Sequence, residues 1–280
     1  MKKTLITLLS LFLIFSLASC TRTADTPPEN EKAEYSLTVS TEGGMPLTNL
    51  TVQVYSDETK TQPLSAGITD KNGLFGFTAS ESDKYVAVIN GFKAGFIPES
   101  EYRLTKGNNE IVVKSKLVEK RNGLVLGDIA FDFELTDVNG TVHKASEILT
   151  NKKALVINLW FENCGPCAME FPYMQQAYEQ YKEKLEILAI NPCDGTNTSI
   201  KQYAVQKSLT FPMAKVNDEW ALAFDGLYGY PTTVIIDRYG MVAMMHTGAI
   251  TDKDTFVKMF EYFTSDNYVQ KTIRGLGDIK

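Results

Sequence analysis

The chain has 280 residues, which is long enough for two modest domains. Its 28 basic and 34 acidic residues give a formal net charge of −6 at pH 7. This acidic balance argues against nucleic acid as a partner and against a polybasic membrane-binding patch. Four cysteines occur, Cys20, Cys164, Cys167 and Cys193, which are too few for a fold built on disulfide bonds.

The first 20 residues, MKKTLITLLSLFLIFSLASC, have the pattern of an export signal. Two lysines precede an apolar run over residues 5–17, and small residues follow, which is the order of a secretory signal peptide. The end of this segment, LASC (17–20), closely resembles the lipobox of bacterial lipoproteins, in which the chain is cut before a cysteine that carries a diacylglycerol. The resemblance implies that residues 1–19 are a lipoprotein signal peptide and that lipidated Cys20 anchors the protein to a bacterial membrane, outside the cytoplasm. The alternative is an ordinary signal peptide with an unrelated cysteine.

Residues 20–34 are polar, contain prolines and lack large apolar side chains, so they are predicted to form a flexible tether. Residues 35–118 predict a small all-β domain. The segments YSLTVS, LTVQVYS, KYVAVIN and NEIVVKSKL read as strands, and Gly-Gly and Asn-Gly pairs mark turns between them. Several short strands with regular turns favour a small β-sandwich.

Within this region, residues 43–77 are similar to the carboxypeptidase-regulatory and transthyretin-like β-sandwiches, through GGMPL, VQVY and TDKNGLFGF. The region offers no histidine, paired carboxylates or nucleophile for catalysis. We therefore expect a spacer or a binding domain, and recognition of a partner by exposed loops is the functional alternative.

From residue 124 the pattern changes to alternating strands and helices. After a hairpin-like entry with Asn139-Gly140 at its turn, strands are predicted at 154–161, 185–191, 231–237 and 242–248, and helices at 171–184, 199–208 and 251–263. The continuous apolar run ALVINLWF (154–161) is typical of a strand buried on both faces. The alternation predicts an α/β fold with a mixed central sheet over residues 124–265, followed by a C-terminal tail at 266–280.

Cys164 and Cys167 stand two residues apart, directly after this apolar strand and at the start of a helix. A helix N-terminus presents unpaired N–H groups and partial positive charge, which stabilise a thiolate. We therefore expect Cys164 to be exposed and nucleophilic, and Cys167, one turn further on, to be buried. Pro166 between them is tolerated, because its missing N–H would be unpaired in the first turn.

The stretches VINLWFENCGPCAMEFP and GYPTTVIID resemble the thioredoxin superfamily, and are closer still to its TlpA/ResA branch of extracytoplasmic thiol-disulfide oxidoreductases. The segment CGPC (164–167) matches the thioredoxin redox motif. Tyr230 and Pro231 match the cis-proline loop, which in the family packs against the disulfide and pairs with substrate backbone. Trp160 falls on the aromatic residue of the strand-end motif. The resemblance implies a thioredoxin-like fold over residues 124–265, with Tyr230, Pro231 and Trp160 at the substrate-binding side.

Two positions separate the branches of this superfamily. Asn158 stands where cytoplasmic thioredoxins carry a buried aspartate, and Glu170 stands where the extracytoplasmic branch has a glutamate. On a helix Cys167 and Glu170 share a face, so the carboxylate could take and return the proton of the buried thiol if desolvation raises its pKa. The alternative is that Glu170 lies on a solvated helix edge.

Two further features depart from the family pattern. Asn163, preceded by Glu162, stands where the family usually has tryptophan, and a carboxylate near Cys164 would disfavour its thiolate. Cys193 follows the predicted strand 185–191. If that strand is parallel to 154–161, both end at one edge of the sheet. Cys193 would then be a third thiol near the pair, able to modulate or trap a mixed disulfide, and a loop cysteine without a role is the alternative.

The resemblance implies a membrane-anchored enzyme that reduces protein disulfides: Cys164 attacks, Cys167 resolves with help from Glu170, and a membrane thiol carrier supplies electrons. No cofactor is predicted beyond the redox-active disulfide. No metal site is predicted either, because zinc takes four ligands at short spacings and neither His143 nor His246 is near a cysteine in sequence. An oxidase or isomerase remains open, as does a surface binding lipoprotein with a permanent 164–167 disulfide.

Overall fold

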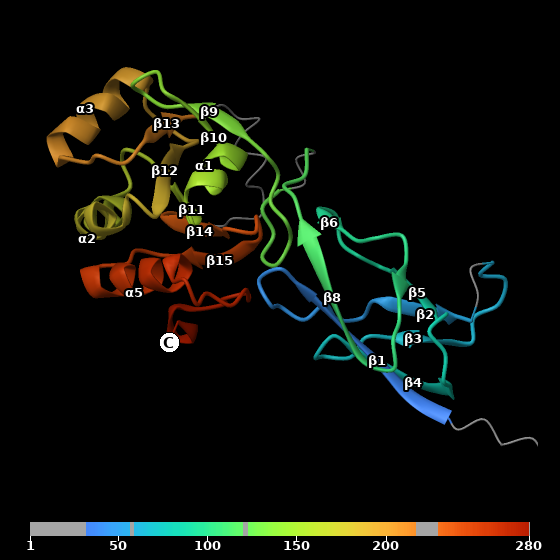
Figure 1. The fold of residues 1–280 in the computed structure, drawn as a ribbon. Coiled ribbons are helices and arrows are strands. Elements are labelled where there is room, and N and C mark those ends of the chain that lie inside the picture. Colours follow the sequence, from blue (N-terminus) through green and yellow to red (C-terminus); the bar gives the residue numbers. More distant parts are fainter. Residues whose placement is uncertain (1–31, 57–58, 120–122, 217–228, 280) are drawn as a thin grey trace, which may run out of the picture.

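The structure, a computed structural model, describes residues 32–56, 59–119, 123–216 and 229–279. The predicted signal peptide, Cys20 and most of the predicted tether lie outside these residues. Within the described ranges, no helix is long and apolar enough to cross a membrane. The chain forms a β-rich region first and an α/β region second, and the two lie side by side (Figure 1).

The β-rich region consists of two four-stranded sheets. The order is β4-β1-β8-β6 in the first sheet and β3-β2-β5-β7 in the second. Buried apolar side chains from both sheets, such as Leu37 on β1 and Val52 on β2, form one cluster. The strands are β1 (Lys32–Thr41), β2 (Thr51–Tyr55), β3 (Ser65–Ile68), β4 (Leu74–Ser80), β5 (Val86–Asn90), β6 (Phe96–Ile97), β7 (Tyr102–Arg103) and β8 (Gly107–Ser115).

Two features of this region differ from the sequence-based expectations. Strand β1 begins at Lys32, inside the predicted tether, because Lys32 pairs with Ser80 and Ala33 is buried. The strands β3, β4, β6 and β7 were not predicted. The two to four residues of β3, β6 and β7 are too few to show an alternating pattern, and β4 begins in a segment that was read as a turn between strands.

The α/β region is built on a five-stranded mixed sheet of order β13-β12-β11-β14-β15. Strands β11, β12 and β13 are parallel, and β14 and β15 run antiparallel to their neighbours. The predicted mixed sheet is therefore confirmed. Its strands are β11 (Ala154–Leu159), β12 (Leu185–Asn191), β13 (Met213–Lys215), β14 (Thr232–Asp237) and β15 (Val242–Thr247), preceded by the hairpin of β9 (Glu134–Thr136) and β10 (Val142–Lys144).

Helices cover both faces of this sheet. The helices α2 (Gly165–Tyr181) and α5 (Lys253–Thr264) share one core with Val156 of β11. Helix α1 (Ala145–Asn151) lies over the other face, in a core with Leu155 and Ile157. Helix α3 (Asn197–Lys207) follows β12. All six residues of β11 are buried, as its continuous apolar run predicts. This arrangement of sheet and helices is a thioredoxin-like fold.

The segment after α5, predicted to be a tail, packs against both regions. The N–H of Gln270 donates to the carbonyl of Gly43 in the β-rich region at 2.7 Å, and Ile273 bridges to Met244 of β15. A second link comes from Ser115, whose hydroxyl donates to the carbonyl of Tyr239 at 2.7 Å. The residues after Thr264 therefore join the β-rich region to the α/β sheet.

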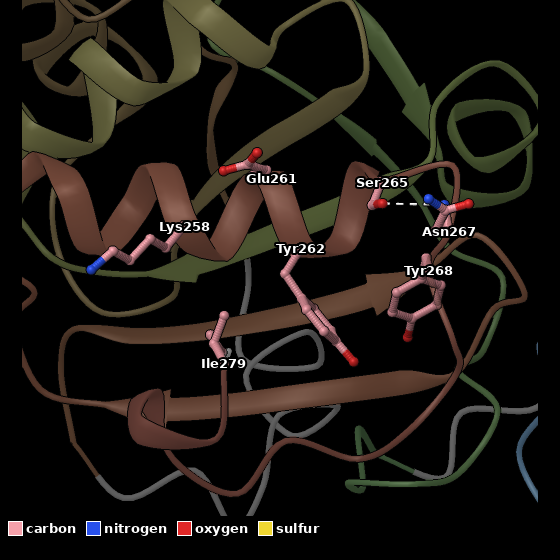
Figure 2. A pocket seen from close by; sticks show the side chains of 7 residues that line it. All are labelled: Lys258, Glu261, Tyr262, Ser265, Asn267, Tyr268 and Ile279. Carbon is pink, nitrogen blue, oxygen red and sulfur yellow. Dashed lines mark hydrogen bonds between the residues drawn. The ribbon is translucent and has the colours of Figure 1, made fainter.

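A buried carboxyl anchors this segment to the sheet. Asp237, at the end of β14, accepts hydrogen bonds from the Tyr268 hydroxyl at 2.9 Å and from the Met241 N–H at 3.0 Å, and burial raises its pKa to about 6. Asp237 pairs with Ala154 at the start of β11, so this anchor lies at the sheet edge opposite the one where β11 ends. A hollow of about 620 Å³ lies beside it (Figure 2), lined by Lys258, Glu261, Tyr262, Ser265, Asn267, Tyr268 and Ile279.

Gly43→Ala is expected to lower the free energy of unfolding by about 1–3 kcal/mol. The added Cβ would lie 2.4 Å from Gln270 Cβ and 2.7 Å from the Tyr239 ring, so the interface between the regions would have to open. Urea unfolding measures the effect. The matched control is Gly275→Ala, whose Cβ would meet no described atom within 4 Å, and it should stay within about 0.5 kcal/mol of the wild type. Equal effects of the two substitutions would contradict this account of the interface.

Candidate active site

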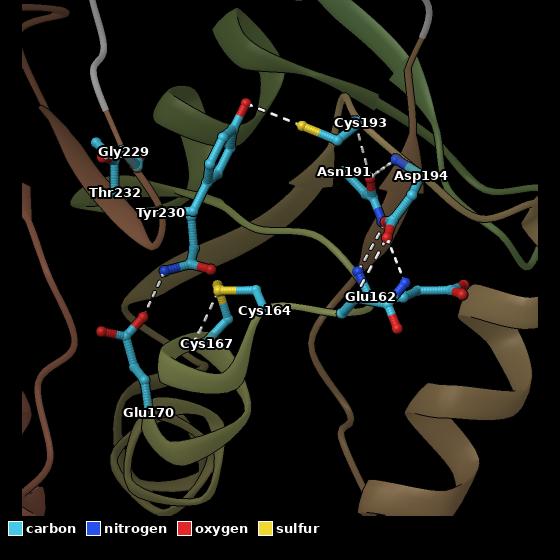
Figure 3. The surroundings of a disulfide bond; sticks show 12 residues. Glu162, Cys164, Cys167, Glu170, Asn191, Cys193, Asp194, Gly229, Tyr230 and Thr232 are labelled. Carbon is cyan, nitrogen blue, oxygen red and sulfur yellow. Dashed lines mark hydrogen bonds between the residues drawn. A yellow bond between two sulfur atoms is a disulfide. The ribbon is translucent and has the colours of Figure 1, made fainter.

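Cys164 and Cys167 form a disulfide bond at the N-terminus of α2, with their Cα atoms 5.3 Å apart (Figure 3). Cys164 is the N-cap residue of the helix, and its sulfur accepts the N–H of Cys167 at 3.1 Å. An N–H bond to sulfur and the positive end of the helix both favour a thiolate over a thiol. The geometry therefore suits Cys164 to act as the attacking sulfur.

Cys164 is less accessible than the sequence suggests. Cys167 is fully buried as predicted, but Cys164 exposes only 4% of its surface, so the prediction of an exposed Cys164 is wrong for the disulfide-bonded form. Cys164 packs into the same apolar cluster as Trp160 and Phe171, and Tyr230 packs against that cluster. In the part of the chain that the structure describes, Cys193 is the free and exposed cysteine.

Glu170 lies one helical turn beyond Cys167, and its side chain is fully buried. One carboxyl oxygen accepts from Nδ2 of Asn158 at 2.8 Å and the other from the N–H of Ile250 at 2.9 Å. Burial raises the pKa of Glu170 to about 7, although both hydrogen bonds lower it. A solvated position at the helix edge is therefore excluded, and this carboxyl can gain or lose a proton near neutral pH.

Asn158 holds this carboxyl from the sheet side. Its Nδ2 group also donates to the hydroxyl of Thr233, at 3.2 Å, across the β11–β14 pair. Its Oδ1 atom is buried and has no hydrogen-bond partner among the described residues. Asn158 thus donates to the Glu170 carboxylate, while its own acceptor atom, Oδ1, makes no hydrogen bond to the described residues.

Trp160 lies in the apolar core that also contains the two cysteines. It is fully buried, with its ring 5.2 Å from that of Phe171 and 5.1 Å from that of Tyr203, between centroids. The expectation that Trp160 binds substrate is therefore corrected, because its indole has no surface to offer. Its place is in the packing that supports the start of α2.

Tyr230 and Pro231 form the loop that precedes β14, and the peptide bond between them is cis. The Tyr230 ring packs edge-on against Phe161, with centroids 5.3 Å apart. Its hydroxyl accepts a hydrogen bond from the thiol of Cys193 at 3.1 Å (Figure 3). Because β11 and β12 are parallel, as the sequence reading required, Cys193 does stand at the same sheet edge as the disulfide.

Asp194 is a residue of the site that sequence reasoning missed. Its carboxylate accepts from the N–H of Glu162 at 2.8 Å, from Nδ2 of Asn163 at 3.1 Å and from Nδ2 of Asn191 at 3.0 Å. Burial raises its pKa, but these hydrogen bonds prevail and hold the pKa of Asp194 below its usual value. In the sequence, Asp-Gly after a strand marks only a turn, so nothing there shows which groups the carboxylate holds.

The carboxylate of Glu162, which was expected near Cys164, does not face the disulfide. The Glu162 side chain points away from the disulfide, toward α3 (Figure 3), where it accepts from the hydroxyl of Ser199. The N-terminus of α3 is a favourable place for a carboxylate. Asn163, which stands in place of the family's tryptophan, binds Asp194 and so fastens the turn before Cys164.

The two histidines lie on β10 and on β15, where His246 pairs with Thr233. His143 Nε2 is 3.0 Å from the carboxylate of Asp137, and burial lowers the pKa of His246 on β15. Among the described residues, no group of three or more His, Cys, Asp or Glu side chains is placed to hold a metal ion.

Comparison with known proteins places the α/β region in a family. Residues 126–245 match the AhpC/TSA family. A thiol-disulfide oxidoreductase ResA of Geobacillus kaustophilus is 34% identical over 136 residues, which are 48% of this chain and 76% of that protein. The chain belongs to the ResA family of thiol-disulfide oxidoreductases. It is therefore an enzyme of thiol-disulfide exchange, within the thioredoxin superfamily.

Other relatives also cover about half of the chain. The thioredoxin-like protein YneN of Bacillus subtilis is 29% identical over 143 residues, which are 50% of this chain and 82% of YneN. A crystal structure of a thiol:disulfide interchange protein of the thioredoxin family from Chlorobium tepidum is 25% identical, with a TM-score of 0.41, and covers 48% of this chain and 97% of its own.

Proposed function

We propose that this member of the ResA family reduces disulfide bonds in proteins, with Cys164 and Cys167 as its redox centre. The observation that carries the proposal is the position of the pair. Cys164 caps α2 with its sulfur on the N–H of Cys167, and the buried carboxyl of Glu170, with a pKa raised to about 7, follows one turn later.

The reaction begins with the reduced pair. The thiolate of Cys164 attacks one sulfur of a substrate disulfide, so a mixed disulfide forms and the other substrate sulfur leaves as a thiolate that takes up a proton. Cys167 then loses its proton and attacks the Cys164 sulfur. The second substrate sulfur leaves and is protonated, and the 164–167 disulfide remains. The substrate has gained two electrons and two protons.

Glu170 is the acceptor for the Cys167 proton in this scheme. The two residues are three apart on α2, which places them on the same helix face. A base works best when its pKa is close to the working pH, and burial brings the pKa of Glu170 to about 7. The hydrogen bonds from Asn158 and Ile250 stabilise the carboxylate until it takes the proton.

Tyr230 and Pro231 supply the contact surface for the substrate segment. They lie on the loop that packs beside the disulfide, with the Tyr230 ring against Phe161. This role follows from the family resemblance of the loop. Cys164 itself is almost covered, so the substrate disulfide has to approach along this edge.

The remaining parts of the proposal concern where the enzyme works. Each turnover leaves the pair oxidised, so a donor of two electrons is needed, and we assign this to a thiol carrier in the membrane. Lipidated Cys20 would hold the protein there, outside the cytoplasm, with residues 20–34 as tether. The β-rich region would be a β-sandwich that acts as a spacer or as a binding domain for partners.

The test of direction uses the purified full-length protein in detergent with two probe proteins. It should accelerate the reduction of insulin by dithiothreitol, and it should not accelerate the oxidation of reduced, unfolded ribonuclease A in air. Faster ribonuclease oxidation without insulin reduction would assign the opposite direction. Failure in both assays would leave the pair as a structural disulfide.

A further inference from the structure

One short loop contacts both segments that flank the disulfide. Residues 192–195 follow β12. The loop is shaped by the last residue of that strand, Asn191, whose buried amide oxygen accepts the N–H groups of Cys193 at 3.0 Å and Asp194 at 3.1 Å. These two hydrogen bonds fix the directions in which the side chains of Cys193 and Asp194 point. Asp194 points to the turn before Cys164, and Cys193 points to Tyr230 (Figure 3).

The contact between Cys193 and Tyr230 joins two loops that are far apart in sequence. The Cys193 thiol donates to the Tyr230 hydroxyl at 3.1 Å. The Tyr230 ring in turn packs edge-on against Phe161, which precedes the redox helix. The tyrosine is thus held at its ring by Phe161 and at its hydroxyl by Cys193.

We propose that Cys193 is a positioning residue, whose thiol holds Tyr230 by a hydrogen bond and so fixes the loop that a protein substrate contacts beside the disulfide. The proposal rests on the proposed function, because it gives Tyr230 a substrate to contact. In this role Cys193 acts as a hydrogen-bond donor, and its sulfur is neither oxidised nor reduced.

The chemistry of the two groups suits this role. Burial raises the pKa of Tyr230 to about 12, so the phenol stays neutral at physiological pH. A neutral hydroxyl accepts a hydrogen bond from a thiol, which is a weak donor. Serine carries a donor on the same Cβ but forms no disulfide, so Cys193→Ser separates hydrogen bonding from thiol chemistry.

The experiment measures kcat and KM of the full-length protein for insulin and for a small aromatic disulfide, with dithiothreitol as donor. Cys193→Ala should raise the KM for insulin about twofold to threefold, the loss expected for a hydrogen bond at the weak end of the usual range. The KM for the small disulfide should rise less than the KM for insulin, because a small molecule contacts less of the Tyr230 loop than a protein segment does. Cys193→Ser should restore the KM, Tyr230→Phe should match Cys193→Ala, and the double variant should add nothing further.

Three outcomes would overturn the proposal. If Cys193→Ser behaves like Cys193→Ala, the sulfur acts as a thiol. If the double variant loses the product of the two single losses, the residues act independently. If Cys193→Ala leaves the KM for insulin unchanged, the bond positions nothing that the substrate uses.

A second readout needs no turnover and separates this proposal from the proposed function. The S–H stretching band of Cys193 is isolated as the Raman difference between the oxidised wild type and Cys193→Ser. The band should shift when Tyr230→Phe removes the acceptor oxygen. An unshifted band would contradict the hydrogen bond even in a protein that reduces insulin, and a shifted band would support it in one that does not.

Discussion

Cys164→Ser is expected to lower the rate of insulin reduction by at least about a thousandfold, because a serine hydroxyl stays protonated where the thiolate of Cys164 is stabilised. Cys167→Ser should also stop turnover, but after the first step. Cys164 can still attack, and without the second thiol the mixed disulfide cannot be resolved. Mass spectrometry should then find the substrate covalently attached to Cys167→Ser and absent from Cys164→Ser.

The two variants are matched controls for each other. Both lack the 164–167 disulfide, so any effect of losing that bond on folding is common to the pair. Addition of dithiothreitol should release the trapped substrate. Trapping by Cys164→Ser in place of Cys167→Ser would contradict the assignment of Cys164 as the attacking sulfur.

Glu170→Gln is expected to remove a pH-dependent loss of stability. Burial raises the pKa of Glu170 from 4.5 to about 7 in the folded protein. The stability that the protonated carboxyl provides is therefore complete below pH 4.5 and is lost as the pH rises through 7. By pH 8 the wild type should have lost about 3 kcal/mol relative to the variant. Urea unfolding of the two oxidised proteins at a series of pH values measures the difference.

The structure can accommodate glutamine at this position. The amide oxygen can accept from the N–H of Ile250, and its NH₂ group can donate to Oδ1 of Asn158, which has no partner among the described residues, if the Asn158 amide turns over. Asp237, whose pKa burial raises to about 6, is present in both proteins and cancels in the difference. Parallel stability curves from pH 4 to pH 8 would contradict the raised pKa of Glu170.

The same variant tests the catalytic role of this carboxyl. Loss of a general base slows a proton transfer by about a hundredfold or more. The effect should fall on the resolving step, so the mixed disulfide should accumulate during turnover. An unchanged resolving rate would leave Glu170 with a structural role only.

The sheet and the redox pair were predictable because their signals are local. The run ALVINLWF marks β11 by its apolar character, and β12 (Leu185–Asn191) has the predicted bounds. The apolar face from residue 171 predicted the body of the next helix, and the CGPC motif was expected at its start, where Pro166 is tolerated in the first turn. Helix α2 begins at Gly165, with Cys164 as its N-cap.

The features that the sequence did not predict are contacts between residues that lie far apart along the chain. The parallel pairing of β1 with β8 and the packing of Gln270 on Gly43 join segments that carry no matching local pattern. The same holds for Asp194, which is an ordinary turn residue in the sequence and becomes the anchor of the turn before Cys164 only in the fold. Trp160 was misassigned because a motif gives a residue's position along the strand and not the depth of its side chain.

The reduction potential of the 164–167 pair tests the central claim most directly. The protein would be equilibrated in graded dithiol/disulfide buffers, and the free thiols that change in number by two would be trapped by alkylation and counted by mass. A reductase should give a value near that of thioredoxin, about −270 mV. A value near that of the oxidant DsbA, about −120 mV, would contradict reduction as the direction of the reaction. A pair that never opens would contradict a redox role altogether.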